Sequence, residues 1–280
     1  MTKVVLISSF LLMSFLAKAQ EFKGKADYFS KRIVKEKVEV NKAIGEKQMD
    51  PVTEKAFQEA MKRASEKQYS LSFTKAECLY EEVEQLEKPE AQASGGVSFK
   101  IAFSGEGKKY LNLKENKSIT EDEIFGKEFL IVEPIEKPDW KLVNETKKIG
   151  EYNCFKAELL IQVTEKQKEE YKEFLKKEEA KPSLFKMEEP KDKTIVAWYT
   201  PEIPVSFGPK NYWGLPGLIL EINEEETIIL CSKVALNTKE KSKIKVPNSG
   251  DKVTQKQFDE IQKKKMDSMK NEDGVIIFEH

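Results

Sequence analysis

The sequence predicts an α+β protein built on a large, curved antiparallel β-sheet, open or half-barrel-like in shape, with two or three helices. Strand-like segments recur along most of the chain, and short turns separate most of them. Only a few segments show helical periodicity instead. Because short turns join successive strands, we expect neighbours to pair antiparallel, with one or two helices covering a face of the sheet.

The chain opens with the pattern of a secretory signal peptide. Lys3 precedes an apolar run over residues 4–16, and Ala17-Lys18-Ala19 is a small-x-small cleavage pattern. The run of about 13 residues is too short to cross a bilayer comfortably, and no stop-transfer pattern follows it. We therefore expect a signal peptide over residues 1–19 that is cleaved near Ala19, no transmembrane segment after cleavage, and a periplasmic or secreted protein.

The mature chain, residues 20–280, is predicted to form one domain, because single β-domains reach about 250 residues and no proline- or serine-rich linker divides the chain. The whole chain has 48 Lys and Arg against 49 Asp and Glu, a formal net charge of −1, with the two signs interspersed. Such a surface gives no reason to expect nucleic-acid binding. Segment 87–96, with a proline and paired glycines, is the best candidate for a flexible surface loop.

The N-terminal half is predicted to place one helix among several strands. An extended segment over residues 22–40 opens the sheet. Asp50-Pro51 then has the pattern of a helix start, and the helix is expected to end near Gln68. Its predicted buried face holds Phe57, Met61 and Ala64. Further strands are expected over residues 69–73, 76–83, 97–103, 109–113, 124–133 and 140–145.

The C-terminal half continues the sheet around a charged segment. A long strand over residues 152–163 precedes this segment, at about 164–181, for which we expect an exposed helical excursion within a hairpin. A disordered charged loop is the alternative. Further strands are expected over residues 194–199, 218–223 and 227–236. A late helix begins at a capping box formed by Thr254 and Gln257.

A six-residue motif links a turn to a buried strand. It consists of Gly214, Leu215, Pro216, Gly217, Leu218 and Ile219. Pro216 presets φ at about −65° and Gly217 accepts positive φ, which predicts a type II turn leading into an apolar strand. The motif resembles the signature of the GLPGLI family, secreted proteins abundant in Bacteroidetes-type bacteria whose biochemical role is uncharacterised for most members.

The resemblance extends over roughly residues 140–236. An upstream block covers residues 140–150 with Tyr152, Cys154, Lys156 and Ala157, and a second block covers residues 197–204 with Gly208-Pro209. The resemblance implies an exported protein. Family members are often encoded near outer-membrane receptor systems, so such a system is the partner that it implies. It implies no set of catalytic residues.

Five aromatic residues cluster within sixteen positions around a loop stiffened by prolines. They are Trp198, Tyr199, Phe207, Tyr212 and Trp213. A rigid aromatic loop loses little entropy on binding, which favours recognition of a ligand or partner at these residues. The alternative is that they plug one end of the sheet.

The sequence offers little for catalysis or for binding a metal or cofactor. The only histidine is the terminal His280, which argues against a Ser-His-Asp triad, a Cys-His pair or a His-ligated zinc. No phosphate loop or dinucleotide fingerprint is present, so no cofactor is expected. The acidic triples 121–123 and 224–226 lack the spacing of a calcium loop and are expected to be solvated turns.

Cys78, Cys154 and Cys231 make an odd set for an oxidising compartment. One disulfide among them with one free thiol is one expectation, and the sequence does not choose the pairing. Three small side chains buried in strands are the alternative. The lack of a CxxC spacing argues against redox catalysis.

These observations favour an exported, non-enzymatic envelope protein that binds a protein partner or an apolar, lipid-like ligand. A curved sheet with helices over one face could enclose such a ligand, and an apolar cavity would then be expected. The alternative is a carboxylate-dependent hydrolase acting on envelope glycan or peptide. That activity requires two acidic groups converging in a cleft.

Overall fold

The computed structural model describes residues 22–33, 65–83, 107–180, 189–237 and 244–268, together with positions 52, 55, 59, 60 and 62. Several predicted features lie outside these residues: the signal peptide, the loop over 87–96, the strand over 97–103 and His280. Of the helix predicted from Asp50, only scattered positions are described, and all of them are helical. Strand structure begins at Glu66, so this helix ends before the predicted Gln68.

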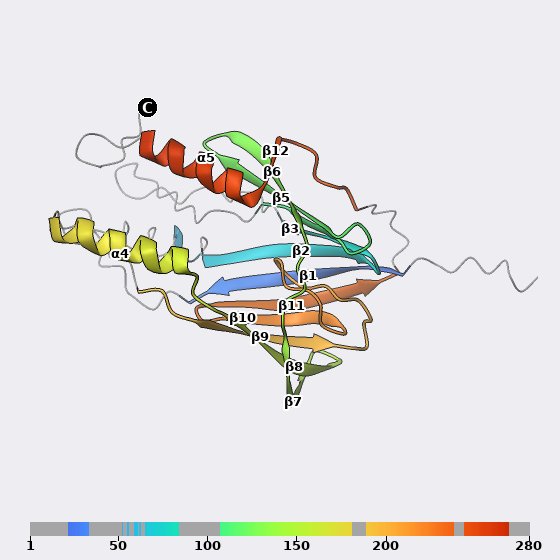
Figure 1. Ribbon diagram of the computed structural model, residues 1–280. Coiled ribbons are helices and arrows are strands. Elements are labelled where there is room, and N and C mark those ends of the chain that lie inside the picture. Colours follow the sequence, from blue (N-terminus) through green and yellow to red (C-terminus); the bar gives the residue numbers. More distant parts are fainter. Residues whose placement is uncertain are drawn as a thin grey trace, which may run out of the picture.

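One open sheet of twelve strands forms the body of the protein (Figure 1). Its strands are β1 (Lys23–Arg32), β2 (Glu66–Thr74), β3 (Glu77–Glu82), β4 (Lys109–Asn112), β5 (Lys117–Ile124), β6 (Lys127–Pro134), β7 (Lys141–Ile149), β8 (Tyr152–Ile161), β9 (Lys193–Thr200), β10 (Leu218–Glu224), β11 (Thr227–Leu236) and β12 (Asp251–Val253). They lie in the order β12-β6-β5-β4-β3-β2-β1-β11-β10-β9-β8-β7. Apart from the parallel pair β12 and β6, all described neighbours pair antiparallel. The predicted α+β class with an open, curved antiparallel sheet is confirmed.

One hairpin differs from the sequence prediction. The single strand expected over residues 124–133 is instead β6, preceded by β5, and the two pair residue by residue. Phe125 and Gly126 form the turn between them, with φ of 49° and 81°, as a type I′ hairpin turn requires. The acidic triple 121–123 therefore lies in a strand and not in a solvated turn. Pairing with β6 overrides the low strand propensity of these acidic residues.

Two helices beside the sheet, α4 and α5, are described over their whole length. Helix α4 (Glu165–Ala180) leaves β8 and returns to β9, which pair with each other, so the predicted helical excursion within a hairpin is present. Helix α5 (Gln255–Ser268) packs Phe258 edge-on against Phe129 of β6, with ring centroids 5.6 Å apart. Lys166 and Asp259 join the two helices through an ion pair of 3.5 Å, and both helices lie at the same end of the sheet (Figure 1).

Both helices begin with a capping box. The Thr254 amide donates to Gln257 Oε1 at 2.9 Å, and the Gln257 amide donates back to Thr254 Oγ1 at 3.2 Å, as predicted. Thr164 and Gln167 make the same two bonds at the start of α4, at 2.9 and 3.2 Å. Each box satisfies two amide groups that have no partner within the helix. α4 therefore starts sharply, although nearly all of its described side chains are exposed.

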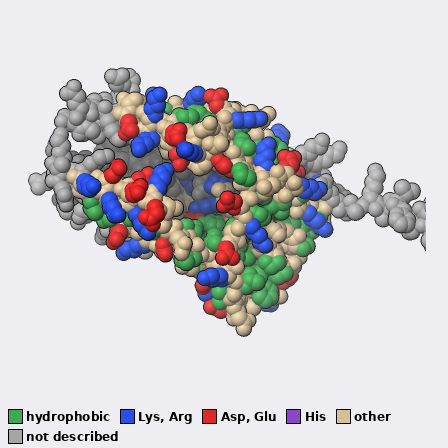
Figure 2. Space-filling view, in the orientation of Figure 1, with side chains coloured by type: hydrophobic (Ala, Val, Ile, Leu, Met, Phe, Trp, Pro, Cys, Tyr) green, Lys and Arg blue, Asp and Glu red, His purple; other side chains and the backbone are tan. Residues whose placement is uncertain are grey.

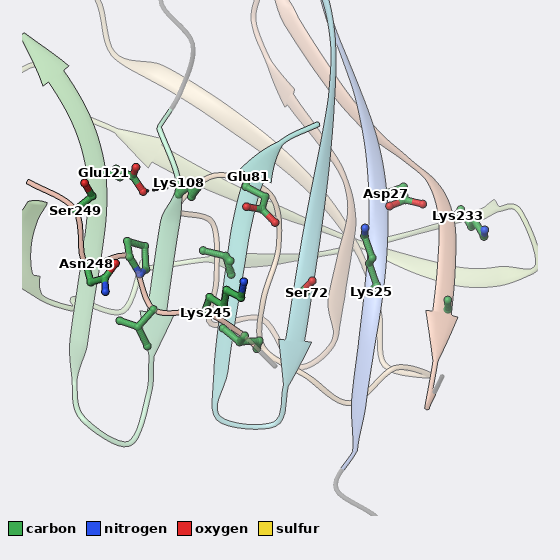
Figure 3. Close-up of a pocket in the computed structure, with 15 residues that line it drawn as sticks. Lys25, Asp27, Ser72, Glu81, Lys108, Glu121, Lys233, Lys245, Asn248 and Ser249 are labelled. Atoms are coloured by element: carbon green, nitrogen blue, oxygen red, sulfur yellow. Dashed lines mark ion pairs between the residues drawn. The ribbon is translucent and has the colours of Figure 1, made fainter. Parts of the chain in front are cut away.

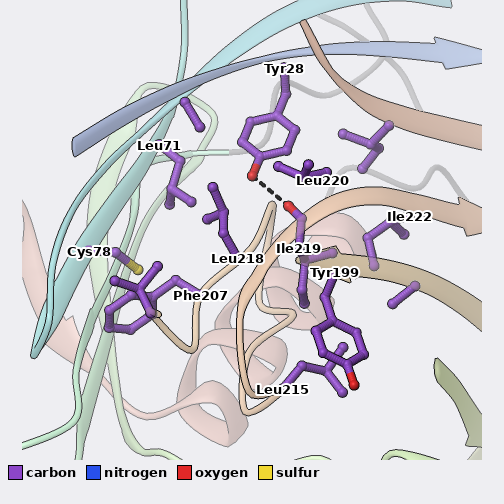
Figure 4. Packing of buried hydrophobic residues seen from close by; sticks show 14 of the residues in the cluster. Tyr28, Leu71, Cys78, Tyr199, Phe207, Leu215, Leu218, Ile219, Leu220 and Ile222 are labelled. Carbon is purple, nitrogen blue, oxygen red and sulfur yellow. Dashed lines mark hydrogen bonds between the residues drawn. The ribbon is translucent and has the colours of Figure 1, made fainter. Parts of the chain in front are cut away.

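The two faces of the sheet carry separate cores, because successive strand residues point to opposite faces. The larger core lies on one face and includes Tyr28, Leu71 and Phe73, which are at most 1% exposed. On the other face Leu79 and Tyr110 belong to a smaller cluster, which also contains Ile119 and Leu130. The larger core is covered by the loop between β9 and β10, residues 201–217, and Figure 4 shows part of it.

The three cysteines are free thiols in the structure. Cys78 and Cys154 are fully buried, and Cys231 is partly buried. All three lie in strands and contact the larger core. The structure thus places the three cysteines as free thiols in strands, two of them buried and one partly buried.

Candidate functional site

The six-residue motif closes the larger core. Leu215, Leu218 and Ile219 are at most 1% exposed. The Leu218 amide donates to the Ile203 carbonyl at 3.0 Å, and the Ile219 amide donates to the Phe207 carbonyl, also at 3.0 Å. These hydrogen bonds hold the segment from Ile203 to Phe207 next to the start of β10. The loop is therefore hydrogen-bonded to the sheet and forms part of its hydrophobic interior.

The turn inside the motif is not the predicted type II turn. The Gly217 amide donates to the Leu215 carbonyl at 2.9 Å, which is the bond of a γ-turn centred on Pro216. Gly217 has no positive φ; the positive φ in the motif, 94°, belongs to Gly214. Gly217 is required for another reason, since a Cβ atom there would lie 2.2 Å from the Thr200 carbonyl oxygen. The glycine permits the close approach of two backbones.

The five aromatic residues singled out in the sequence do not form one surface. Phe207 and Tyr199 are buried in the larger core, at 0% and 6% exposure. Trp198 lies opposite Lys156 and Glu221 in the sheet, so it points to the face opposite Tyr199. The other two, Tyr212 and Trp213, are half-buried at the end of the loop. The alternative, that the aromatic residues plug the sheet, therefore describes Phe207 and Tyr199. Only Tyr212 and Trp213 remain at a loop surface.

Trp198 is held by a charged pair on its own face of the sheet. The Lys147 ammonium lies 4.3 Å from the centre of the Trp198 ring. The same nitrogen binds both carboxylate oxygens of Glu221, at 2.7 and 2.8 Å. A cation placed over an indole face and beside a carboxylate is stabilised by both. These contacts, together with packing of Trp198 against the larger core, explain its half-burial without a ligand.

A compact corner, which we call the Trp140 corner, joins the loop to the start of β7. It consists of Trp140, Lys210, Tyr212, Trp213 and Glu224. Trp140 Nε1 donates to the Trp213 carbonyl at 2.8 Å, and the rings of Trp140 and Tyr212 meet edge-on at 6.0 Å. Glu224 accepts from the Tyr212 hydroxyl at 2.7 Å and from the Lys210 ammonium at 2.6 Å. The corner is thus fixed by directed contacts from three parts of the chain.

Sequence reasoning missed Trp140 and Glu224 as members of this corner. Trp140 lies 72 positions before Tyr212 in the sequence, and Glu224 belongs to an acidic triple that was expected only to form a solvated turn. No local pattern connects them. The one available signal was that Trp140 opens the upstream block of the family resemblance.

The edge strand β7 begins directly after the Trp140 corner. β7 is the last strand in the sheet order and, among the described residues, pairs only with β8. Two large apolar side chains are exposed at this edge of the sheet: Leu142 on β7 is 64% exposed, and Phe155 on β8 is 40% exposed. Figure 2 shows hydrophobic side chains gathered over the end of the sheet that holds β7 to β10. An open strand edge and an apolar surface therefore adjoin a rigid corner.

A polar cavity lies over the middle of the sheet, between β5 and β11, on the face of the smaller core (Figure 3). Its volume is about 820 Å³. Lys25, Asp27, Ser72, Leu79, Glu81, Lys108, Glu121, Lys233, Ala235 and the segment Ile244 to Ser249 line it. Lys108 and Glu121 form an ion pair of 3.4 Å. This cavity is charged and so differs from the apolar cavity expected of a lipid carrier.

Reactive thiols and metal ligands are not assembled in the described part of the chain. Burial raises the pKa of Cys154 to about 11 and that of Cys231 to about 12, so both are neutral thiols at neutral pH. No group of three His, Cys, Asp or Glu side chains among the described residues could hold a metal ion. No described helix is long and apolar enough to span a membrane.

Comparison with known proteins finds one family of unknown function that matches part of the chain, and distantly similar solved structures. A family described as "Protein of unknown function (Porph_ging)" matches residues 140–221, which run from the Trp140 corner to β10. No curated protein matches the chain. Two solved structures titled "Structure of PNGF-II", in space groups C2 and P21, are similar, at 14% and 15% identity and TM-scores of 0.46 and 0.48. They cover 88% and 87% of this chain, which spans about a third of theirs, 33% and 34%.

Proposed function

We propose that the chain is an exported, non-enzymatic protein of the cell envelope, of the GLPGLI type, that binds a protein partner. The signal-peptide pattern of residues 1–19 supports export to the periplasm or beyond. The six-residue motif and the upstream block support the family assignment. An outer-membrane receptor system is the class of partner that this family resemblance implies.

The observation that carries the proposal is the open edge of β7 beside the Trp140 corner. An edge strand presents unpaired backbone N–H and C=O groups, to which an extended segment of another protein can add as a further strand. Leu142 offers such a segment an exposed apolar contact on the strand itself. The corner fixes the start of β7, so little ordering is needed on binding.

A protein partner fits the geometry better than an apolar ligand does. Phe207, Leu215 and Leu218 fill the space on the face where a lipid would have to enter, and each is at most 1% exposed. The cavity over the other face is lined largely by charged and polar groups. A lipid tail placed there would leave those charges without water or a partner.

Site-specific photo-crosslinking in the native envelope tests the proposal. The photoreactive residue p-benzoylphenylalanine replaces Leu142, and in a matched control it replaces Ile228, which is 39% exposed in the middle of the sheet. We expect one defined protein adduct from position 142 and none of that mass from position 228. No adduct from position 142, or the same adducts from both positions, would contradict partner binding at β7.

A carboxylate-dependent hydrolase is the second candidate, because the cavity contains Asp27 and Glu81. Ser70 lies between them in the sheet, opposite both, so their α-carbons are two strand spacings apart, about 10 Å. Carboxyl groups of paired-acid hydrolases lie about 5–10 Å apart. Release of labelled fragments from envelope glycan or peptide that disappears in both Asp27→Asn and Glu81→Gln would favour this candidate over the first.

A further inference from the structure

A row of polar residues that includes both positive and negative side chains crosses the strands beneath the polar cavity. Lys233 on β11 lies opposite Asp27 on β1, which lies opposite Ser70 on β2. Ser70 in turn lies opposite Glu81 on β3. Residues directly opposite one another point to the same face of a sheet. Lys25, two residues before Asp27, points to that face as well.

A strap over this row is formed by the segment Ile244 to Ser249, which runs across the strands (Figure 3). Ile244 packs on the smaller core, and Pro247 is buried. At the far end the Ser249 hydroxyl donates to the carboxylate of Glu128 on β6. The strap is therefore anchored along its length, and its Lys245 and Asn248 side chains line the cavity.

Most of the charged side chains that line the cavity form no ion pair with a described residue. Lys108 and Glu121 pair at 3.4 Å. The remaining charged lining residues make no ion pair with any described residue: Lys25, Asp27, Glu81, Lys233 and Lys245. Charged groups within a cavity are stabilised when a ligand places opposite charges close to them. Three cations and two anions remain to be matched in this way.

We propose that this cavity binds a short peptide that carries both acidic and basic groups. A purely anionic ligand would meet Asp27 and Glu81, and a purely cationic one would meet the lysines, so only a ligand of mixed charge matches the whole row. Ser72 and Asn248 offer neutral hydrogen bonds, while Leu79 and Val246 offer apolar contact. The volume of about 820 Å³ suits a ligand of two to four residues, since small-ligand sites measure about 300–1,000 Å³.

Titration calorimetry on the full mature chain tests this inference with four probes. They are the N-acetylated, C-amidated tripeptides Glu-Gly-Lys, Glu-Gly-Glu and Lys-Gly-Lys, and the uncharged trimer of N-acetylglucosamine. We expect saturable binding of Glu-Gly-Lys that weakens as salt is added, and at least tenfold weaker binding of the other three. Lys25→Gln and Asp27→Asn should each weaken Glu-Gly-Lys binding at least tenfold with an unchanged thermal midpoint.

Lys263→Gln, an exposed lysine on α5 outside the cavity, serves as the matched control and should bind the peptide as the unaltered chain does. The inference would be overturned if the uncharged sugar, Glu-Gly-Glu or Lys-Gly-Lys bound more tightly than Glu-Gly-Lys. It would also be overturned if binding survived both cavity substitutions, or if no probe bound. The cavity and the β7 edge are separate surfaces. Photo-crosslinking from position 142 should therefore persist in Lys25→Gln, and the two proposals can fail independently.

Discussion

The Tyr28 hydroxyl donates a hydrogen bond of 2.7 Å to the backbone carbonyl of Ile219, although the two residues are 191 positions apart in the sequence. Both residues are buried, and Figure 4 shows the bond within the larger core. The amide of Ile219 is bonded to the Phe207 carbonyl. Ile219, the last residue of the motif, is therefore hydrogen-bonded through both of its backbone polar groups. Its carbonyl accepts from β1, and its amide donates to the covering loop.

Tyr28→Phe should destabilise the protein by about 1–3 kcal/mol, because it leaves the buried Ile219 carbonyl without this donor while keeping the ring. Urea unfolding followed by circular dichroism gives the free energy of unfolding. Tyr171→Phe, on α4, is the matched control, since the Tyr171 hydroxyl makes no hydrogen bond with another described residue. The control should stay within about 0.5 kcal/mol. Equal effects of the two substitutions would show that the Tyr28 bond adds nothing to stability.

Gly217→Ala should destabilise the protein more than Gly150→Ala does. A Cβ at position 217 would lie 2.2 Å from the Thr200 carbonyl oxygen, so two paired backbones must move apart; overpacking of this kind costs about 1–3 kcal/mol or more. At position 150 the new Cβ meets nothing within 4 Å, and only the φ of 58° opposes it, at about 1–2 kcal/mol. Unfolding in urea ranks the two. A smaller loss at position 217 would mean that the close approach is relieved at little cost.

Lys147 and Glu221 should be energetically coupled. Lys147→Met leaves the Glu221 carboxylate, whose side chain is only 13% exposed, without its cation, and should cost about 1–3 kcal/mol. Removing the charge from both, in Lys147→Met with Glu221→Gln, should cost less than the sum of the single changes, by about 0.5–3 kcal/mol. A double-mutant cycle from urea unfolding measures this difference. Additive losses would exclude coupling between the two groups.

Stability should fall as the pH rises above about 9, and part of that fall should come from Cys154. Burial raises the pKa of this thiol from 9.0 to about 11. Between those two pH values the unfolded chain loses the thiol proton while the folded chain keeps it, so the unfolded state is favoured as pH increases. The contribution is fully present below pH 9. Cys154→Ala should show a shallower decline of the unfolding free energy between pH 8 and 10.5, and an unchanged slope would contradict this assignment.

Much of the fold could be predicted from the sequence, because the signals concerned were local. The strand signals of β8 and β9, the charged helix between them and the Thr254 capping box all depend on residues within a few positions of one another. The role of Gly217 could not be predicted, because it is set by the Thr200 backbone, which approaches only after β9 and β10 have paired. The same holds for β5, whose acidic residues become a strand through pairing with β6.

The two candidate sites could not be predicted either, because each joins residues that are far apart in the sequence. The polar cavity takes one or two residues from each of several strands, and each of them, such as Lys25 or Glu81, looks like an ordinary solvent-facing charge in its own segment. The Trp140 corner joins residues from the segment before β7, the loop and the end of β10. The aromatic cluster in the sequence did locate the loop. It did not indicate that Phe207 and Tyr199 would point into the core while Trp198 faced the other way.

Trp140→Phe should separate the stability of the fold from recognition at β7. The substitution keeps an aromatic ring beside Tyr212 but removes the Nε1 donor to the Trp213 carbonyl, at a cost of about 0.5–1.5 kcal/mol. If β7 binds an extended partner segment, loosening its starting point should reduce the photo-crosslinking yield from position 142 more than this modest loss of stability explains. Tyr28→Phe, on β1 with four strands between it and β7, should lower stability at least as much and leave the yield unchanged. Equal yields in both variants would show that the corner does not organise the edge for binding.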